Sequence, residues 1–156
     1  MAEIASHVVD QLEPQARAKG LDLTLDTVRS VVAGDRDRLT QVLVNIVGNA
    51  VQYSDAGTIS VVVTADAGWA RVSVTDQGRG LADADQTRIF ERFYRVDEQF
   101  TDGTGVGLAI AKLIVDAHNG VITAVSAGVG HGARFTVDLP LAASPAPRAD
   151  REAGNA

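Results

Sequence analysis

One stretch of the chain, residues 42–54, combines the periodicity of a buried helix with side chains suited to binding. Apolar residues occupy most of its positions. At 100° per residue, the amides in and just before it fall within one stripe about 80° wide, which consists of Gln41, Asn45, Asn49 and Gln52. An unpaired amide in a core costs about 1–3 kcal/mol, so a row of them needs partners. We therefore expect a core helix with one polar seam that binds something.

Two glycine clusters are the other candidates for chemistry. "DQGRG", residues 76–80, follows the strand-like "WARVSVT", and "GTGVG", residues 103–107, opens a helical segment. Glycines in front of a helix let backbone N–H groups point at an anion, and the helix dipole adds to the attraction. The second cluster does not follow a strand as a Rossmann loop does, and it lacks the Gly-Lys-Ser/Thr of a P-loop. It is a phosphate site in outline, although a glycine-rich turn alone is more often only a turn.

The elements that must position these motifs alternate along the chain. Helical periodicity and end signals predict helices over residues 3–20, 36–53 and 107–120, the second capped by Asp35 and the other two closed by Gly20 and Gly120. Alternating patterns predict strands over residues 21–26, 27–33, 58–66, 69–76, 121–127 and 133–140. Hairpins on both sides of the last long helix favour an α+β fold, with helices on one face of a mixed sheet, over a doubly wound fold.

The composition limits the class of protein. The 156 residues are 46% hydrophobic and have room for one domain, whereas residues 142–156 lack an apolar period and predict a disordered tail. A net charge of −6 argues against a nucleic-acid or membrane-surface binder. The absence of cysteine excludes disulfide and thiolate chemistry. Since no apolar run of about 18 residues is present, we expect a cytoplasmic chain that makes no membrane contact itself.

Five motifs in this order and at these spacings resemble the ATP-binding catalytic domain of sensor histidine kinases. They look like that family's N box, first glycine box, F box, second glycine box and third glycine segment, in the form "RLTQVLVNIVGNAVQYS", "DQGRG", "IFERFYR", "GTGVGLAIAK" and "GVGHGARFTVDLP". The resemblance covers nearly all of residues 1–141. It implies a Bergerat-type two-layer sandwich, in which a mixed, mainly antiparallel sheet packs on three helices and ATP with Mg²⁺ lies between the asparagine helix and a mobile lid.

The resemblance also implies roles for single side chains. Asn49 matches the residue whose amide oxygen ligates Mg²⁺, which prefers hard oxygen ligands, and Asn45 lies beside the phosphates. Tyr53 matches the ring near adenine. Asp76 matches the carboxylate that accepts a hydrogen bond from the adenine amino group, which would select adenine over guanine. Arg95 matches a lid arginine near the terminal phosphate, a role suited to a permanently charged fork.

Further positions follow from the same motifs. The nucleotide-binding loops are expected at Gly78, Gly80, Gly103, Thr104, Gly105, Val106, Gly107 and Leu108. Gln52 also faces the site, but it stands where many members of the family have a Lys or Arg, so one positive charge is missing there. Phe90 and Phe93, spaced i,i+3, are expected to anchor the lid to the domain. Because residues 97–102 are acidic and short of apolar anchors, we expect them to be mobile without nucleotide.

Kinases of this family phosphorylate a histidine on a separate dimerising helical hairpin, which then serves a response regulator. His7 is not followed directly by the acidic residue expected after such an acceptor, and it lies in the domain's own first helix. His118 and His131 are expected at a helix end and in a surface turn. The resemblance therefore implies a catalytic part that needs its acceptor from another segment or another protein, whether the chain is a piece of a kinase or a separate subunit of a split one.

Two alternatives compete with phosphotransfer. An ATP-hydrolysing clamp of the same superfamily places a Glu one turn before the Mg²⁺ asparagine, and here that position is Asn45, which cannot accept a proton. A non-catalytic nucleotide sensor is disfavoured by the presence of Asn49, Asp76 and the glycines of "GTGVG", although the lost charge at Gln52 keeps it open.

Overall fold

The computed structural model of the chain describes residues 1–96 and 105–143. Its elements in chain order are α1 Ala2–Ala18, β1 Leu21–Thr27, α2 Arg36–Tyr53, β2 Gly57–Asp66, β3 Trp69–Asp76, α3 Asp85–Arg88, α4 Gly107–Ala117, β4 Val121–Val125 and β5 Ala133–Pro140. In this part of the chain no helix is long and apolar enough to cross a membrane. The predicted mobility at residues 97–102 lies outside the described residues. Of the tail predicted to be disordered, residues 142–156, only the first two residues are described, and the Ala142 N–H donates to the Val31 carbonyl at 2.8 Å.

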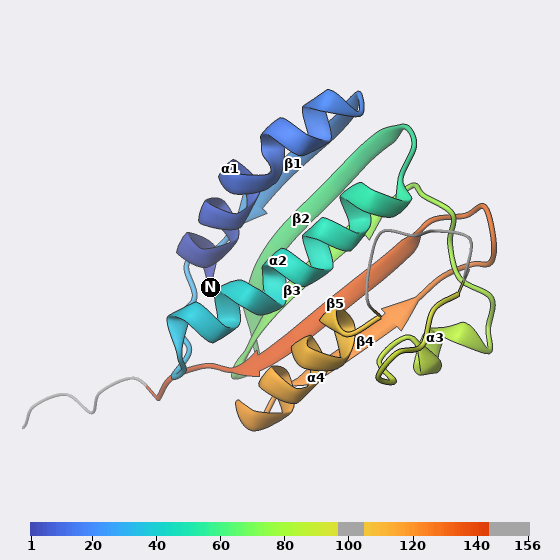
Figure 1. Ribbon diagram of the computed structural model, residues 1–156. Helices are drawn as coiled ribbons and strands as arrows, with labels where there is room; N and C mark the ends of the chain where they lie inside the picture. Colours follow the sequence, from blue (N-terminus) through green and yellow to red (C-terminus); the bar gives the residue numbers. More distant parts are fainter. Residues whose placement is uncertain (97–104, 144–156) are drawn as a thin grey trace, which may run out of the picture.

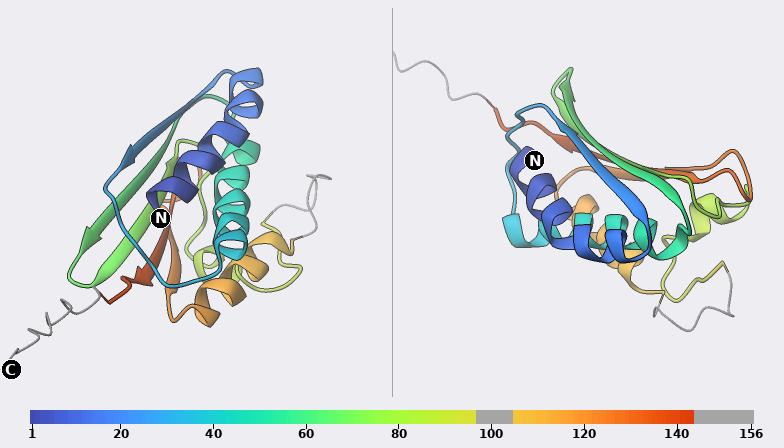
Figure 2. Two further views of the ribbon diagram at one scale, coloured as in Figure 1. Left: turned by 90° about the vertical axis from the view of Figure 1, so that its left-hand side faces the viewer. Right: turned by 90° about the horizontal axis from the view of Figure 1, so that it is seen from above.

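The elements form two layers, a five-stranded sheet and the helices α1, α2 and α4 on one of its faces (Figures 1 and 2). The strand order is β1-β2-β3-β5-β4. Only the β1–β2 pair is parallel, and the other three pairs are antiparallel. The predicted α+β sandwich with a mixed, mainly antiparallel sheet is therefore confirmed.

The core lies between the sheet and the helices because each strand alternates its side chains. In β2, Val61 and Val63 are buried while the residue between them is partly exposed, and Val72 and Val74 repeat the pattern in β3. The helix α2 covers this surface with seven buried apolar residues. Its N-terminus is capped as predicted, since the Asp35 carboxylate accepts a hydrogen bond from the Arg38 N–H at 3.1 Å. The core thus fixes which face of α2 stays polar.

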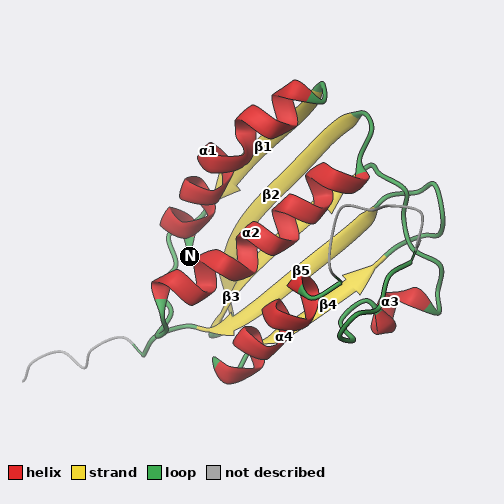
Figure 3. Cartoon of the chain, in the orientation of Figure 1, coloured by secondary structure: helices red, strands yellow, loops and turns green. Residues whose placement is uncertain are grey.

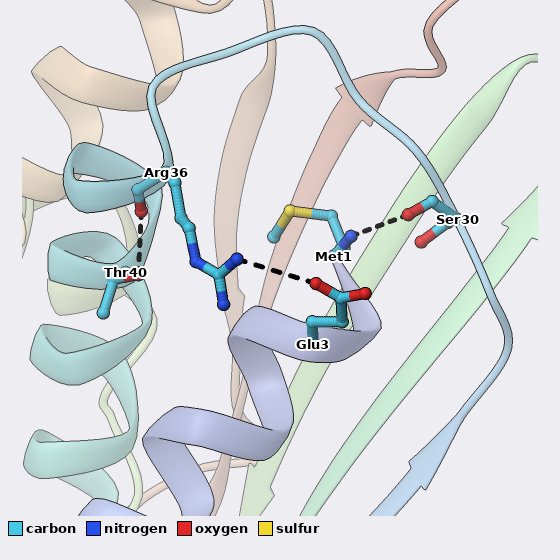
Figure 4. Close-up of polar contacts among 5 residues, drawn as sticks. All are labelled: Met1, Glu3, Ser30, Arg36 and Thr40. Atoms are coloured by element: carbon cyan, nitrogen blue, oxygen red, sulfur yellow. Dashed lines mark hydrogen bonds and ion pairs between the residues drawn. The ribbon is translucent and has the colours of Figure 1, made fainter.

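Polar contacts hold the start of α1 against the segment that leads into α2 (Figure 4). The α-amino group of Met1 donates to the Ser30 carbonyl at 2.7 Å. Glu3 and Arg36 form an exposed ion pair at 3.6 Å, and the Thr40 hydroxyl donates to the Arg36 carbonyl. The beginnings of α1 and α2 therefore lie together, and the two helices run in the same direction to the other end of the sheet (Figure 1).

One predicted strand does not form, and one helix ends a residue earlier than predicted. Residues 27–33 do not form a second strand, because their backbone groups pair with scattered partners: the Val28 N–H with the Val63 carbonyl, and the Val31 carbonyl with the Ala142 N–H. Only an isolated bridge, between Val32 and Leu141, remains. The helix α4 is closed by Asn119, which takes the left-handed conformation with φ 57°, one residue before the predicted Gly120.

Candidate functional site

A cavity of about 430 Å³ opens where α2 ends and α4 begins. The loop after β3, the segment around α3 and the hairpin between β4 and β5 lie at this end of the sheet (Figure 3). The lining comes from the last two turns of α2, the end of β3, the loop that follows it, the segment after α3, the start of α4 and the hairpin between β4 and β5. Both predicted glycine clusters and the amide helix therefore meet at one site.

Asp76, the last residue of β3, lines this cavity and is only 8% exposed. Its Oδ1 accepts hydrogen bonds from the backbone N–H groups of Gly78, at 2.9 Å, and Ala133, at 3.2 Å. Burial raises the pKa of the Asp76 carboxyl above that of an ordinary aspartate, and these two hydrogen bonds lower it in part. Because both bonds end on Oδ1, the carboxylate is fixed in orientation and Oδ2 can accept from a ligand.

The loop after β3 is joined to the hairpin between β4 and β5. The Gly132 N–H donates to the Gly78 carbonyl at 3.1 Å. The backbones approach so closely that a Cβ on Gly80 would lie 2.1 Å from the Gly128 carbonyl oxygen, and a Cβ on Gly132 equally close to that of Asp76. Gly80, Gly128 and Gly132 also have positive φ, which favours glycine. The first and third glycine segments therefore form one rigid support for Asp76.

Ser126 completes this support. Its hydroxyl accepts from the Leu81 N–H at 3.0 Å and lies 2.6 Å from the Gly132 carbonyl, to which it donates. Its own carbonyl accepts from the Gln86 side chain at 3.0 Å. Through its hydroxyl and its main-chain carbonyl, this one residue connects the hairpin, the loop after β3 and α3. Sequence reasoning missed Ser126, because a serine at the end of a strand carries no signal of its own.

The polar seam of α2 divides between the cavity and the framework. Asn49, Gln52 and Tyr53 line the cavity, as predicted. Asn45 is not among the lining residues, and its Nδ2 donates to the Gly107 carbonyl at 2.9 Å. The Asn45 amide therefore joins α2 to the first residue of α4, one turn of helix before Asn49.

The second glycine cluster is described only in part. Gly105, Gly107 and Leu108 line the cavity, and Gly105 has a φ of 69°. Val106 stands at the N-cap of α4 and is not a lining residue. Predicted sites at Gly103 and Thr104 lie outside the described residues. The start of α4 nevertheless faces the cavity, as expected for a helix end that attracts an anion.

Arg95 is held beside this glycine cluster. A Cβ on Gly105 would lie 3.2 Å from the Arg95 Cγ, and the neighbouring Phe93 N–H donates to the Gly105 carbonyl at 2.9 Å. Arg95 lines the cavity, and its Nη2 is buried without a hydrogen-bond partner. Since a buried guanidinium donor without a partner is costly, this group is suited to an anionic ligand oxygen.

The two phenylalanines of the "IFERFYR" motif behave differently. Phe90 packs edge to face on Phe135 of the core, with ring centroids 6.3 Å apart, as an anchor should. Phe93 is 67% exposed, and the prediction that it anchors the lid is wrong. Its backbone is left-handed, with a φ of 65°, and the Arg92 guanidinium lies 5.4 Å from the exposed ring's centroid.

Sequence reasoning missed nine lining residues, most of them apolar. The apolar ones are Ala50, Leu81, Ile89, Val96, Val129, Ala133 and Phe135, and the other two are Arg79 and Tyr94. The Tyr94 hydroxyl donates to the Asp85 carboxylate, which raises the pKa of the tyrosine, and the Arg88 guanidinium lies 4.4 Å from the Tyr94 ring centroid. All nine missed residues except Leu81 and Val96 lie inside the five recognised motifs, but the motifs do not show which of their side chains face the cavity.

The two ends of the cavity differ in chemistry. Where the loop after β3 and the hairpin line it, the wall has one buried carboxylate, Asp76, and one cation, Arg79, and its other residues are glycine or apolar. Toward α4 it offers the Asn49 amide, the Arg95 guanidinium and a helix N-terminus. Among the residues of the described ranges, no three His, Asp or Glu side chains gather at a metal-ligand distance. A divalent cation bound there would need most of its ligands from an anionic ligand and water, which is how Mg²⁺ is usually bound.

Comparison with protein families matches residues 34–143 to "Histidine kinase-, DNA gyrase B-, and HSP90-like ATPase". The sensor histidine kinase RppB of Synechocystis sp. is 36% identical over 149 residues, which are 92% of this chain and 33% of RppB. The sensor-like histidine kinase SenX3 of Mycolicibacterium smegmatis is 38% identical over 152 residues, 94% of this chain and 39% of SenX3. The chain thus spans between a third and two fifths of these relatives.

Solved structures agree in fold. Full-length ShkA in complex with AMPPNP superposes with a TM-score of 0.82 and 32% identity, covering 92% of this chain and 30% of ShkA. The nucleotide-free catalytic domain of the histidine kinase ThkA gives a TM-score of 0.79 and 29% identity, covering 90% of this chain and 91% of that domain.

Proposed function

The chain belongs to the family of histidine kinase-, DNA gyrase B- and HSP90-like ATPases, and on this premise we propose that it binds ATP with Mg²⁺ and donates the γ-phosphoryl group to a histidine on a separate phosphoacceptor domain. The sensor histidine kinases among its relatives support the reaction. The observation that carries the proposal is the two-ended cavity, with the buried Asp76 at the apolar end and Asn49, Arg95 and the start of α4 at the other.

The apolar end suits adenine. The Asp76 carboxylate is oriented by two backbone N–H groups on Oδ1, so Oδ2 can accept from the exocyclic amino group. Guanine presents a carbonyl at that position, and two acceptors would face each other in a buried site. Leu81, Ile89 and Ala50 offer apolar contact to the faces of the ring, and Tyr53 lies one turn beyond Asn49 at the same end of α2.

The polar end suits a triphosphate. The backbone at Gly105 and Gly107 and the N-terminus of α4 provide donors and a favourable dipole for phosphate oxygens. Arg95 carries a buried donor for the terminal phosphate. A Mg²⁺ ion ligated by Asn49 would neutralise charge that develops on the phosphates. Gln52 lines the cavity without adding positive charge, so the affinity for ATP should rest on the remaining groups.

Phosphoryl transfer itself requires little covalent chemistry from the chain. An acceptor imidazole nitrogen forms a bond to the γ-phosphorus, the bond from that phosphorus to the β–γ bridging oxygen breaks, and ADP leaves. The domain contributes positioning and charge, which supply most of the rate in such reactions. The acceptor must then be held in line with the bond that breaks, so its placement decides whether transfer occurs.

The chain's own histidines are poorly placed as acceptors. Both ring nitrogens of His118 are engaged, one against the Ile114 carbonyl at 2.7 Å and the other accepting from the Asp35 N–H at 3.1 Å. His7 is exposed on α1, which contributes no residue to the cavity lining. His131 is exposed in the β4–β5 hairpin, which supports the end of the cavity at Asp76, here called the base end. We therefore propose that the acceptor comes from another segment or another protein.

Hydrolysis is not favoured by the same geometry. The Asn45 amide cannot accept a proton at neutral pH, and its Nδ2 already donates to the Gly107 carbonyl. Asp76 is the only carboxylate among the described lining residues, and it lies at the base end. Water bound near the terminal phosphate would thus lack a base from the described lining.

The test uses ATP labelled on the γ-phosphate and a second protein with a dimeric helical hairpin that carries an exposed histidine. The chain alone should neither label itself nor release phosphate at a useful rate. With the hairpin protein, the label should appear on that histidine and be acid-labile and base-stable, as a phosphoramidate is. Stoichiometric acid-labile label on the chain alone would contradict the separate acceptor and make His7 the first residue to mutate. ATP binding without transfer to any hairpin would favour the sensor alternative.

A further inference from the structure

Lys19, which lies outside the cavity, connects the end of α1 to the end of α2. Its ammonium group donates to the Val51 carbonyl at 2.7 Å and to the Gln52 carbonyl at 3.0 Å. The contact is possible because α1 and α2 run side by side and end at the same end of the sheet (Figure 1). Lys19 stands at the C-cap of α1, directly before Gly20, whose φ of 73° turns the chain into β1.

The end of α2 needs such a partner. The last four carbonyls of a helix have no intrahelical donor, and they are usually satisfied by a left-handed residue after the helix or by a basic side chain in its last turn. Here the C-cap residue Ser54 is extended, with φ −105° and ψ 132°, and the last turn of α2 contains no basic residue. The Tyr53 carbonyl receives the Arg79 N–H at 3.3 Å. The two carbonyls before it receive Lys19.

The turn that Lys19 holds is a wall of the cavity. Ala50, Gln52 and Tyr53 all line it and lie within the one turn that follows Asn49. We propose that Lys19 is a positioning residue for nucleotide binding, which fixes the last turn of α2 where it meets the base. This inference rests on the proposed function of the cavity. It assigns Lys19 no contact with the nucleotide itself.

The position of this turn should matter to the base end and not to the metal. Lys19→Met should weaken binding of adenosine and of ATP with Mg²⁺ by the same factor, about fivefold, which corresponds to about 1 kcal/mol. The tightening of ATP binding by Mg²⁺ should not change, because Asn49 precedes the turn that Lys19 holds and lies where α2 has its own hydrogen bonds. Lys19→Arg should restore most of the affinity, since it retains a cationic donor, whereas Lys19→Gln should be intermediate.

A matched control is available on the same helix. Arg17 forms only an exposed ion pair with Glu13, its neighbour one turn earlier, at 2.7 Å, so Arg17→Met makes the same change in charge without touching α2. It should leave both affinities unchanged. Titrations should be done at a temperature at which circular dichroism shows every variant fully folded, so that lost affinity cannot be attributed to unfolded protein.

Hydrogen exchange supplies a readout that does not depend on binding. In the chain without nucleotide, Lys19→Met should speed exchange of the amides in the last turn of α2, residues 50–54, and leave the middle of the helix, residues 44–48, protected. Wild-type affinity together with wild-type exchange in Lys19→Met would overturn the inference while leaving the proposed function intact. Faster exchange with unchanged affinity would also overturn it, since Lys19 would then be a structural cap only. If the wild-type chain binds no ATP, the proposed function fails and the inference fails with it.

Discussion

The two ends of the cavity are built in different ways. At the base end, Asp76 is held by hydrogen bonds to its own oxygen, and the loop beneath it is joined to the β4–β5 hairpin through Ser126 and close glycine contacts. At the phosphate end, the groups come from separate elements: Asn49 from α2, Arg95 from the segment after α3, and Gly107 from the start of α4. The base end is held by a network of hydrogen bonds between two loops, whereas the phosphate end depends on how the helices are placed.

This difference indicates how the two ends should respond to change. A carboxylate fixed by backbone donors can discriminate between bases at little reorganisation cost. The phosphate end can be altered from a distance, because Asn45 joins α2 to Gly107 and the Gly105 carbonyl receives the Phe93 N–H beside Arg95. Substitutions at the base end should therefore change which nucleotide binds, and those at the phosphate end should change how binding depends on metal and phosphate.

The largest effect is expected at the base end. Asp76→Asn replaces the acceptor Oδ2 by a donor, while Oδ1 can still accept from Gly78 and Ala133, so the fold should persist. ATP binding should weaken by about 1.5–3 kcal/mol, the range for a hydrogen bond to a charged group. Isothermal titration calorimetry measures this loss.

The control is Asp116→Asn on α4, which removes a carboxylate paired with Lys112 at the surface and should leave ATP affinity unchanged. Unchanged affinity in Asp76→Asn itself would show that this end does not hold the base.

A smaller effect, of about 1–2 kcal/mol, is expected at the phosphate end. Asn49→Ala should abolish the tightening of ATP binding by Mg²⁺ and leave adenosine binding nearly unchanged, because the proposed role of the amide oxygen is to ligate the metal. Titration of ATP and adenosine with and without Mg²⁺ separates the two contributions.

Gln41→Ala is a suitable control for this variant, since Gln41 lies on the same stripe of α2 and is not a lining residue. If Asn49→Ala weakened the binding of ATP and of adenosine equally, the substitution would have damaged the helix. The result would contradict the proposal that the two ends of the cavity act separately.

The smallest effect concerns the stability of the domain without nucleotide. Burial raises the pKa of Asp76 in the folded chain above its value in the unfolded chain. The folded state therefore holds the proton more tightly, and its stability falls as the pH rises from the ordinary aspartate pKa through the raised one. Asp76→Asn removes this penalty. The variant should be more stable than the wild type at neutral pH, and the difference should vanish in acid below both pKa values.

Denaturant unfolding of the wild type and Asp76→Asn from acid to neutral pH measures that difference. If the difference in free energy of unfolding stayed the same across this range, the prediction would be wrong. It would also be wrong if the wild type were the more stable protein at neutral pH. Either result would mean that burial of the Asp76 charge does not destabilise the folded chain.

The sequence predicted the local elements and the motif residues of the site, but not the contacts that depend on how the elements pack. Periodicity and turn chemistry predict the three long helices, the Asp35 cap and the hairpins, because these are local properties. Motif resemblance placed Asn49, Asp76 and Arg95, which all line the cavity. It did not reveal that Asn45 bonds to the Gly107 carbonyl or that Phe93 turns outward, because both depend on how α2 and the segment after α3 are packed.

Contacts between segments far apart in the chain stayed beyond sequence reasoning. Ser126 supports Leu81 and the hairpin, and Lys19 completes the end of α2, across 45 and 32 or 33 residues of sequence respectively. Neither has a pattern of its own. The predicted strand over residues 27–33 was wrong for a related reason. Its residues alternate as in a strand, yet in the described structure no neighbouring strand is in position to pair with them along their length.

The central claim is that this cavity binds ATP through Asp76 at one end and through Mg²⁺ and Asn49 at the other. The most direct measurement is calorimetric titration of the wild-type chain with ATP and with GTP, each with and without Mg²⁺. The account predicts that ATP binds, that Mg²⁺ tightens its binding, and that GTP binds at least tenfold more weakly, a difference of about 1.4 kcal/mol or more. No binding of ATP, or equal affinity for ATP and GTP, would contradict it.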